Sequence, residues 1–274
     1  MARMPLIQKI RWGIRQFKTQ GIVKSIRHGL RLLNLNPTGY YYYFQIRQNS
    51  KRESKCARPN PFKILWISPN QIEKVSMAQF HKWRDAGRVC AGDWDQHVRP
   101  FTETRVYRSL EEHFINDLPW EDTDIYSWSI DRIDQGKHGW QMCTSRSELD
   151  DRCTEVDELY NRMRDRGYRS WEELTGQNVK NVIKSRKFGT HKTDIAVHID
   201  RNGEFLFVDG RHRLSIAKLL RIEAVAVRVI VRHREWQTRR EAGIHTYRNE
   251  GKTSVHNIDH KDIQTLLSDV KCTS

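Results

Sequence analysis

The segment FLFVDGRHRLSIAKLL, residues 205–220, changes abruptly from apolar to charged side chains. Its first four residues are apolar and predict a buried strand. Asp209 and Gly210 follow, and they predict a sharp turn because glycine adopts positive φ angles without steric cost. Apolar residues recur at helical spacing over 211–220 and predict a helix. The basic residues at 211–213 therefore stand where a strand becomes a helix.

The neighbouring sequence completes a strand–strand–helix–strand unit. Apolar residues at every second position predict a half-buried strand at 195–199. Residues 200–203 predict a hairpin turn, because Asn202-Gly203 suits positive backbone angles. Valines at every second position predict a third strand at 225–231. This order of elements favours an α+β protein with a mixed sheet, or an α/β protein.

The basic residues at the start of the predicted helix indicate an anion site. A helix N-terminus carries unpaired N–H groups and a partial positive charge, so Arg211, His212 and Arg213 destabilise it unless an anion binds. Phosphate is the natural anion, and arginine binds it through two hydrogen bonds. Asp209 suits a helix cap, a general base or a metal ligand. The structural alternative makes Asp209 only a cap, Gly210 only a turn and the arginines exposed.

With the strand that follows it, the segment FVDGRHRLSIAKLL resembles the nucleotide-binding core of the ParB/sulfiredoxin superfamily. The resemblance covers residues 195–236. It implies a ParB/sulfiredoxin-like fold in which Gly210–Arg213 bind the phosphates of ATP or CTP, often with magnesium. The free-serine kinase pattern Asp-Gly-His-His-Arg is the most similar, with Arg211 replacing its first histidine. In that kinase the aspartate helps to activate the substrate hydroxyl, and the resemblance implies this role for Asp209.

The sequence departs from the other branches of that superfamily. Partition proteins have Gly-Glu-Arg-Arg at this point, and Arg211 stands in place of their glutamate. Only about 40 residues follow Arg232, which leaves little room for their helix-turn-helix and dimerisation domains. Arg211 also replaces the catalytic cysteine of sulfiredoxin, so repair of sulfinic acids is not expected.

The resemblance therefore implies a nucleotide-binding protein, and we consider a magnesium-dependent nucleotide hydrolase or a kinase-like phosphotransferase. A DNA-associated nuclease, a nucleotide-gated DNA binder and a membrane-surface adaptor are the alternatives. The predicted catalytic residues are Asp209 and His212, the phosphate-binding residues are Gly210, Arg211, His212 and Arg213, and the magnesium ligand is Asp209. The residues predicted to lie behind the site are His198, Arg232 and His233.

The positive charge is concentrated at the N-terminus. The chain carries a net charge of +14, and residues 1–52 contain eleven Lys or Arg and no Asp or Glu. The remaining residues hold 37 basic and 34 acidic side chains, a net charge of only +3. Residues 1–35 predict a basic amphipathic helical arm. This arm suits DNA phosphates or an anionic membrane surface, or it packs on the rest of the protein.

The rest of the chain predicts one main domain. Residues 36–61 predict a linker, in which the aromatic run at 40–44 forms a short strand or covers a surface. Residues 62–250 predict the domain, with a helical insertion at about 73–190. The predicted insertion includes a helix at 147–164 capped by Ser147, and a capping box that starts another helix at Ser170. Residues 251–274 predict a tail in which Ile263, Leu266 and Leu267 dock as a helix.

The composition indicates a cytoplasmic protein, peripheral to membrane or nucleoid if the arm binds there. No run of about 18 apolar residues exists, and the N-terminus lacks the apolar core of a secretory signal. The five cysteines are odd in number and form no Cys-x-x-Cys pair, which favours reduced, inert thiols over a zinc site. Asp93 and Asp95 flank Trp94 in a predicted turn, with a metal-binding carboxylate pair as the alternative.

Overall fold

The computed structural model describes residues 37–53, 57–184, 194–251, 255 and 257–271, so the predicted N-terminal arm at 1–35 lies outside the described residues. A seven-stranded mixed sheet forms the centre, in the order β1-β7-β5-β6-β2-β4, with β3 paired to β7. The α+β class is thereby confirmed. The strands are β1 (Ile64–Ile67), β2 (Lys74–Ser76), β3 (Arg88–Cys90), β4 (Val98–Pro100), β5 (Ile195–Ile199), β6 (Phe205–Asp209) and β7 (Val225–His233).

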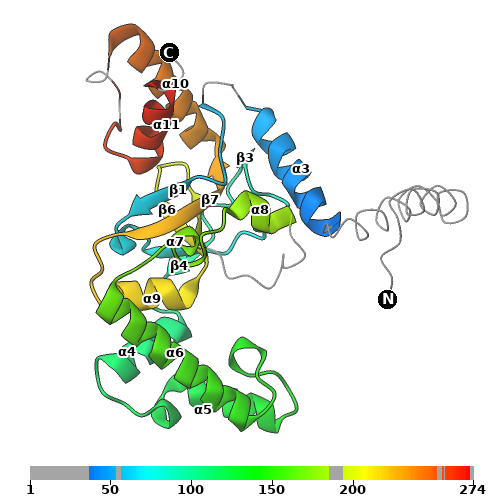
Figure 1. The fold of residues 1–274 in the computed structure, drawn as a ribbon, viewed down its shortest axis with the longest axis vertical. Coiled ribbons are helices and arrows are strands. Elements are labelled where there is room, and N and C mark those ends of the chain that lie inside the picture. Colours follow the sequence, from blue (N-terminus) through cyan, green and yellow to red (C-terminus); the bar gives the residue numbers. More distant parts are fainter. Residues whose placement is uncertain (1–36, 54–56, 185–193, 252–254, 256, 272–274) are drawn as a thin grey trace, which may run out of the picture.

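Helices surround the sheet on several sides (Figure 1). α4, α5 and α6 lie together at one end, with α9 between them and the sheet, and α10 and α11 lie at the opposite end. The helices are α3 (Pro37–Lys51), α4 (Arg105–Phe114), α5 (Asp124–Asp134), α6 (Arg146–Arg166), α7 (Trp171–Thr175), α8 (Val179–Lys184), α9 (Arg211–Leu219), α10 (Arg234–Glu250) and α11 (Lys261–Lys271). The short 3₁₀ turns are η2 (Pro69–Gln71), η3 (Trp120–Asp122) and η4 (Trp140–Met142).

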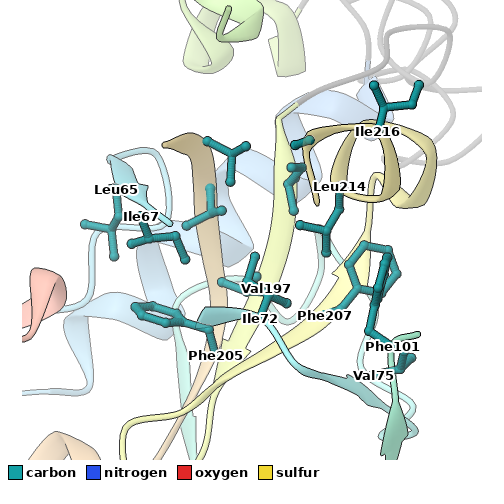
Figure 2. Close-up of a cluster of buried hydrophobic side chains, with 14 of the residues drawn as sticks. Leu65, Ile67, Ile72, Val75, Phe101, Val197, Phe205, Phe207, Leu214 and Ile216 are labelled. Atoms are coloured by element: carbon teal, nitrogen blue, oxygen red, sulfur yellow. The ribbon is translucent and has the colours of Figure 1, made fainter. Parts of the chain in front are cut away.

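The sheet is buried on both faces at its centre. Side chains alternate between the faces of a strand, and Val197 and Phe207 join the larger apolar cluster together with Leu214 of α9 (Figure 2). Ala196 joins a second cluster that contains Trp83. All five residues of β5 are therefore buried. The prediction of a half-buried strand at 195–199 is wrong, because β5 is a central strand covered from both sides.

The hairpin between β5 and β6 is confirmed. The strands pair antiparallel, and Asp200 Oδ1 accepts hydrogen bonds from the backbone N–H groups of Asn202 (2.8 Å) and Glu204 (2.7 Å). Gly203 has a φ of +98°, and a Cβ at this position would lie 2.5 Å from the Trp236 ring. The turn thus needs glycine both for its backbone angle and for contact with the indole.

The aromatic run at 40–44 is helical, so the predicted linker is wrong over α3. A helix places Ile46, which is 1% exposed, against the second apolar cluster. The buried Asn49 donates hydrogen bonds to the carbonyl oxygens of Arg84 (2.8 Å) and Ala86 (3.1 Å). These tertiary contacts outweigh the strand preference of consecutive aromatic residues.

The predicted helical insertion at 73–190 begins with strands. β2, β3 and β4 all join the central sheet, and the first α-helix of this region starts only at Arg105. α6 is capped by Ser145 and not by Ser147, since the Ser145 hydroxyl accepts from the Glu148 N–H at 3.2 Å. The capping box at Ser170 is confirmed. Long-range strand pairing explains the first difference, because short strands of mixed polarity carry little local signal.

The predicted C-terminal helix is confirmed as α11, whose residues Ile263, Leu266 and Leu267 are buried in the main cluster. Three cysteines in the described part of the chain are free thiols, and burial raises the pKa of Cys153 to about 12. Among the described residues, no helix is long and apolar enough to cross a membrane.

Candidate anion-binding site

Gly210 makes the turn between β6 and α9. Its φ and ψ angles are 93° and 31°, and a Cβ at this position would lie 3.1 Å from the Ile195 Cα. Gly210 is itself the N-cap, and no side chain caps α9. The predicted cap by Asp209 is wrong, because its Oδ1 accepts instead from the neighbouring Gly210 N–H at 2.9 Å. The start of α9 is therefore a glycine turn without a capping carboxylate.

Lys82 neutralises Asp209. Lys82 Nζ lies 2.5 Å from Asp209 Oδ2, although the two residues are 127 positions apart in sequence. Burial alone raises the pKa of the Asp209 carboxyl, but the Lys82 charge and hydrogen bond and the Gly210 N–H together hold it below its usual value. Asp209 is thus an ionised carboxylate with a fixed partner at neutral pH.

Arg213 lies on the same side of the turn, near a second carboxylate. One of its terminal nitrogens, Nη2, is 3.5 Å from the place where a Gly210 Cβ would stand. Asp194 is 1% exposed and accepts from the Trp171 N–H at 2.7 Å. Burial raises the pKa of Asp194, while the Trp171 N–H and the charge of Arg213 oppose the rise.

The fully buried Arg228 completes this group, which we call the paired side: Lys82, Asp194, Asp209, Arg213 and Arg228. The Arg228 guanidinium stands 4.6 Å from the centre of the Trp83 ring. Burial lowers the pKa of Arg228 to about 10, although Asp194 and Asp209 oppose this change. The paired side holds three basic and two acidic groups, so most of its charge is compensated within the protein.

Arg211 lies in a different environment. Its guanidinium is 5.7 Å from the centre of the Phe207 ring, and its buried Nε–H has no hydrogen-bond partner within the described residues. Burial, and then the positive charge of Arg99, lower the pKa of Arg211. Neither Arg211 nor Arg99 forms an ion pair within the part of the chain that the structure describes. The charge of Asp209 opposes the lowering of the Arg211 pKa only in part, so the repulsion between the two arginines is not fully compensated.

Arg211 and Arg99 line a cavity of about 410 Å³, which we call the arginine cavity. Its other lining residues come from the β4–α4 connection, α4, α5 and the segment 139–141. The acidic residues in its wall are Glu103 and Asp124, and Asp124 is held by Arg105 at 2.8 Å. Cationic side chains thus outnumber acidic ones around this space.

Two further features mark the wall formed by η4. Trp140 is 5% exposed, and its indole N–H has no partner among the described residues. Gln141 has a φ of +54°, a backbone conformation that non-glycine residues rarely adopt. The Gln141 amide nitrogen lies 3.5 Å from His212 Nδ1, and the ring of Trp140 lies 5.2 Å from that of His212. Strained backbone and unsatisfied donors at one cavity are features of ligand sites.

His198 does not join this site. It lies within β5, between the rings of Phe80 (5.4 Å) and Trp94 (5.6 Å), and burial lowers its pKa to about 3. It is a neutral core histidine on the face of the sheet that carries the second apolar cluster.

The predicted proximity of Arg232 and His233 to the phosphate turn is wrong. Ile199 pairs with both Phe205, at the start of β6, and Arg232, near the end of β7. Gly210 follows the other end of β6, so the end of β7 and Gly210 lie at opposite ends of the strands. There Arg232 forms an ion pair with Asp262 (2.7 Å), and His233 Nε2 lies 2.9 Å from the Gly92 carbonyl oxygen.

The described residues do not fit a resident magnesium site. Both carboxylate oxygens of Asp209 already have partners, and nowhere in the described ranges do three His, Cys, Asp or Glu residues gather as metal ligands. Asp93 and Asp95 both pair with Arg201, at 2.8 and 2.7 Å. The role of Asp209 as a magnesium ligand stays a prediction that requires Lys82 to move away.

Comparisons with known proteins found no similar protein. No family model, no curated protein and no solved structure matches this chain. The relationship to the ParB/sulfiredoxin superfamily therefore stays a prediction from residues 195–236.

Proposed function

We propose that this protein binds the phosphates of a nucleoside triphosphate, ATP or CTP, at the start of α9, as its resemblance to the ParB/sulfiredoxin superfamily implies. The observation that carries the proposal is the position of Arg211. This arginine is partly buried beside Arg99, forms no ion pair with any described residue, and stands at a glycine turn where no side chain caps the helix.

The energetics favour an anion at this position. An unsatisfied buried donor costs about 1–3 kcal/mol, and more when it is charged. A phosphate oxygen that accepts from the Arg211 Nε–H removes this cost, and its charge also relieves the repulsion from Arg99. The partial positive charge of the α9 N-terminus acts in the same direction.

The two arginines of the motif contribute differently to this proposal. Arg211 and His212 face the arginine cavity and Trp140, so they are the proposed ligand contacts. Arg213 is near Asp194 and Asp209, and we assign it chiefly to holding the turn in place. Gly210 contributes by having no side chain between the ligand and the backbone.

Hydrolysis or phosphotransfer is the proposed use of the bound nucleotide. Asp209 would accept the proton of the attacking hydroxyl or water, with His212 as the second titratable group. General bases work best when their pKa lies near the working pH, so the lowered pKa of Asp209 has to rise when substrate displaces Lys82. Magnesium bound with the nucleotide would neutralise phosphate charge.

Isothermal titration of the full chain with ATP, ADP and CTP, with and without magnesium, tests this proposal. We expect ATP or CTP to bind the wild type, and Arg211→Gln to weaken that binding about tenfold or more, because a hydrogen bond to a charged group contributes about 1.5–3 kcal/mol. The matched control is Arg166→Gln, which removes the same charge from the exposed end of α6. Absence of binding by all three nucleotides, or equal losses in both variants, would disprove the nucleotide site.

A further inference from the structure

A second basic cavity lies beside α3. Its volume is about 490 Å³, and we call it the α3 groove. Its lining residues come from one face of α3, from the segment 58–62, from α8 and from α11. They are Tyr43, Ile46, Arg47, Ser50, Lys51, Arg58, Pro59, Asn60, Pro61, Phe62, Lys180 and Leu266. None of them lines the arginine cavity.

The charges of the α3 groove are all of one sign. Four lining residues are basic and none is acidic, and none of the four forms an ion pair within the described ranges. The nearby Glu53 is bound instead by Arg234 at 2.6 Å. The Nε–H of Arg58 is buried without a partner among the described residues. The groove therefore has an unbalanced positive charge and at least one unsatisfied donor.

Aromatic rings hold two of these cations in the absence of carboxylates. Lys180 Nζ lies 5.6 Å from the centre of the Phe62 ring, and the Arg47 guanidinium lies 5.9 Å from that of Tyr43. The two rings are 6.0 Å apart. Cation–π contacts at such exposed sites contribute only about 0.5–1 kcal/mol. A phosphate group is a stronger partner, and cations that move toward it leave the ring faces open to a flat ligand.

We propose that the α3 groove binds single-stranded nucleic acid, with phosphates on its four basic side chains and a base against Phe62 or Tyr43. Cationic side chains interleaved with aromatic rings are the usual surface for single strands. Arg47 and Lys51 also belong to the last part of the acid-free run of residues 1–52, so the groove takes cations from the most basic part of the sequence. A flat membrane surface fits a concave wall less well than a flexible strand does. This activity is independent of the nucleotide site at α9.

Fluorescence anisotropy with a labelled oligothymidylate of about 16 nucleotides tests the proposal on the full chain. The variant Arg58→Gln with Lys180→Gln should weaken binding about tenfold. It should also lower the slope of log K against log salt by about 1.4, because each phosphate contact to a single strand contributes about 0.7. The control variant, Lys137→Gln with Arg166→Gln, removes the same charge from exposed positions outside the groove. It should bind as the wild type does.

A second variant separates base stacking from charge. Phe62→Leu should weaken oligonucleotide binding about fivefold or more, since stacking on an aromatic residue contributes about 1–3 kcal/mol per base. Binding of inorganic polyphosphate should not change. The proposal is overturned if the groove and control variants lose affinity equally. It is also overturned if the groove variant loses binding only to phosphatidylserine vesicles, which would identify the groove as a membrane contact.

Discussion

Arg211 and Arg213 stand two residues apart at the start of α9, yet their surroundings are opposite. Arg213 belongs to the paired side, where Asp194 and Asp209 balance much of the positive charge. Arg211 faces the arginine cavity, where burial lowers its pKa and where the positive charge of Arg99 lowers this pKa more than Asp209 raises it. A helix has 3.6 residues per turn, so positions i and i+2 point to different sides. The comparison separates an arginine that stabilises the fold from one that is available to a ligand.

The largest expected effect concerns the paired side. Asp194→Ala should lower the free energy of unfolding by about 3–5 kcal/mol, because it removes a buried carboxylate and leaves Arg228 buried with less compensation. Urea denaturation measures this change. Arg211→Gln should not lower the same quantity, because it removes a buried charged donor that has no hydrogen-bond partner among the described residues. If Arg211→Gln destabilises the protein as much as Asp194→Ala does, the distinction between the two sides fails.

A smaller loss is expected at the turn that joins the two sides. Gly210→Ala should destabilise the protein by about 1–3 kcal/mol, because its φ of +93° is strained for alanine and the new Cβ would contact Ile195. Gly92→Ala is the control, since Gly92 has a φ of +92° with no atom within 4 Å of the added Cβ. The difference between the urea unfolding midpoints of Gly210→Ala and Gly92→Ala measures the cost of the contact with Ile195, because the backbone strain is similar in both. Equal midpoints would show that the contact with Ile195 has no cost.

The smallest effect is the pH dependence of the Lys82–Asp209 pair. The pKa of Asp209 is lower in the folded protein than its usual 3.8, so its contribution to stability is complete above that value. This contribution is lost as the pH falls through the folded pKa. Since both side chains are partly exposed, the pair contributes at most about 1 kcal/mol.

Urea unfolding of the wild type and of Lys82→Met, followed from about pH 5 down to pH 2, measures this contribution. Lys82→Met should reduce the loss of stability in acid relative to the wild type. An unchanged acid dependence would mean that Asp209 is held ionised by Gly210 and Arg213 and not by Lys82.

Local sequence patterns predicted the unit that contains the site. The apolar run before Asp209, the Asn202-Gly203 turn and the alternating valines of β7 each depend on neighbouring residues, and each prediction was confirmed. Two helix caps were misplaced locally, but the larger errors fall where distant segments meet. α3 and the strands β2, β3 and β4 are stabilised by packing and pairing with residues far away in the chain, so their own sequences carry little signal.

In the candidate site, too, some features follow from the local sequence and others from the tertiary structure. The sequence alone determined that a glycine turn is followed by Arg211, His212 and Arg213, because the change from strand to helix is a local event. Only the tertiary structure decided which arginine meets carboxylates and which meets Arg99. The reason is that helix geometry sets the direction of each side chain, whereas its charge partners come from remote segments that long-range packing brings to the turn.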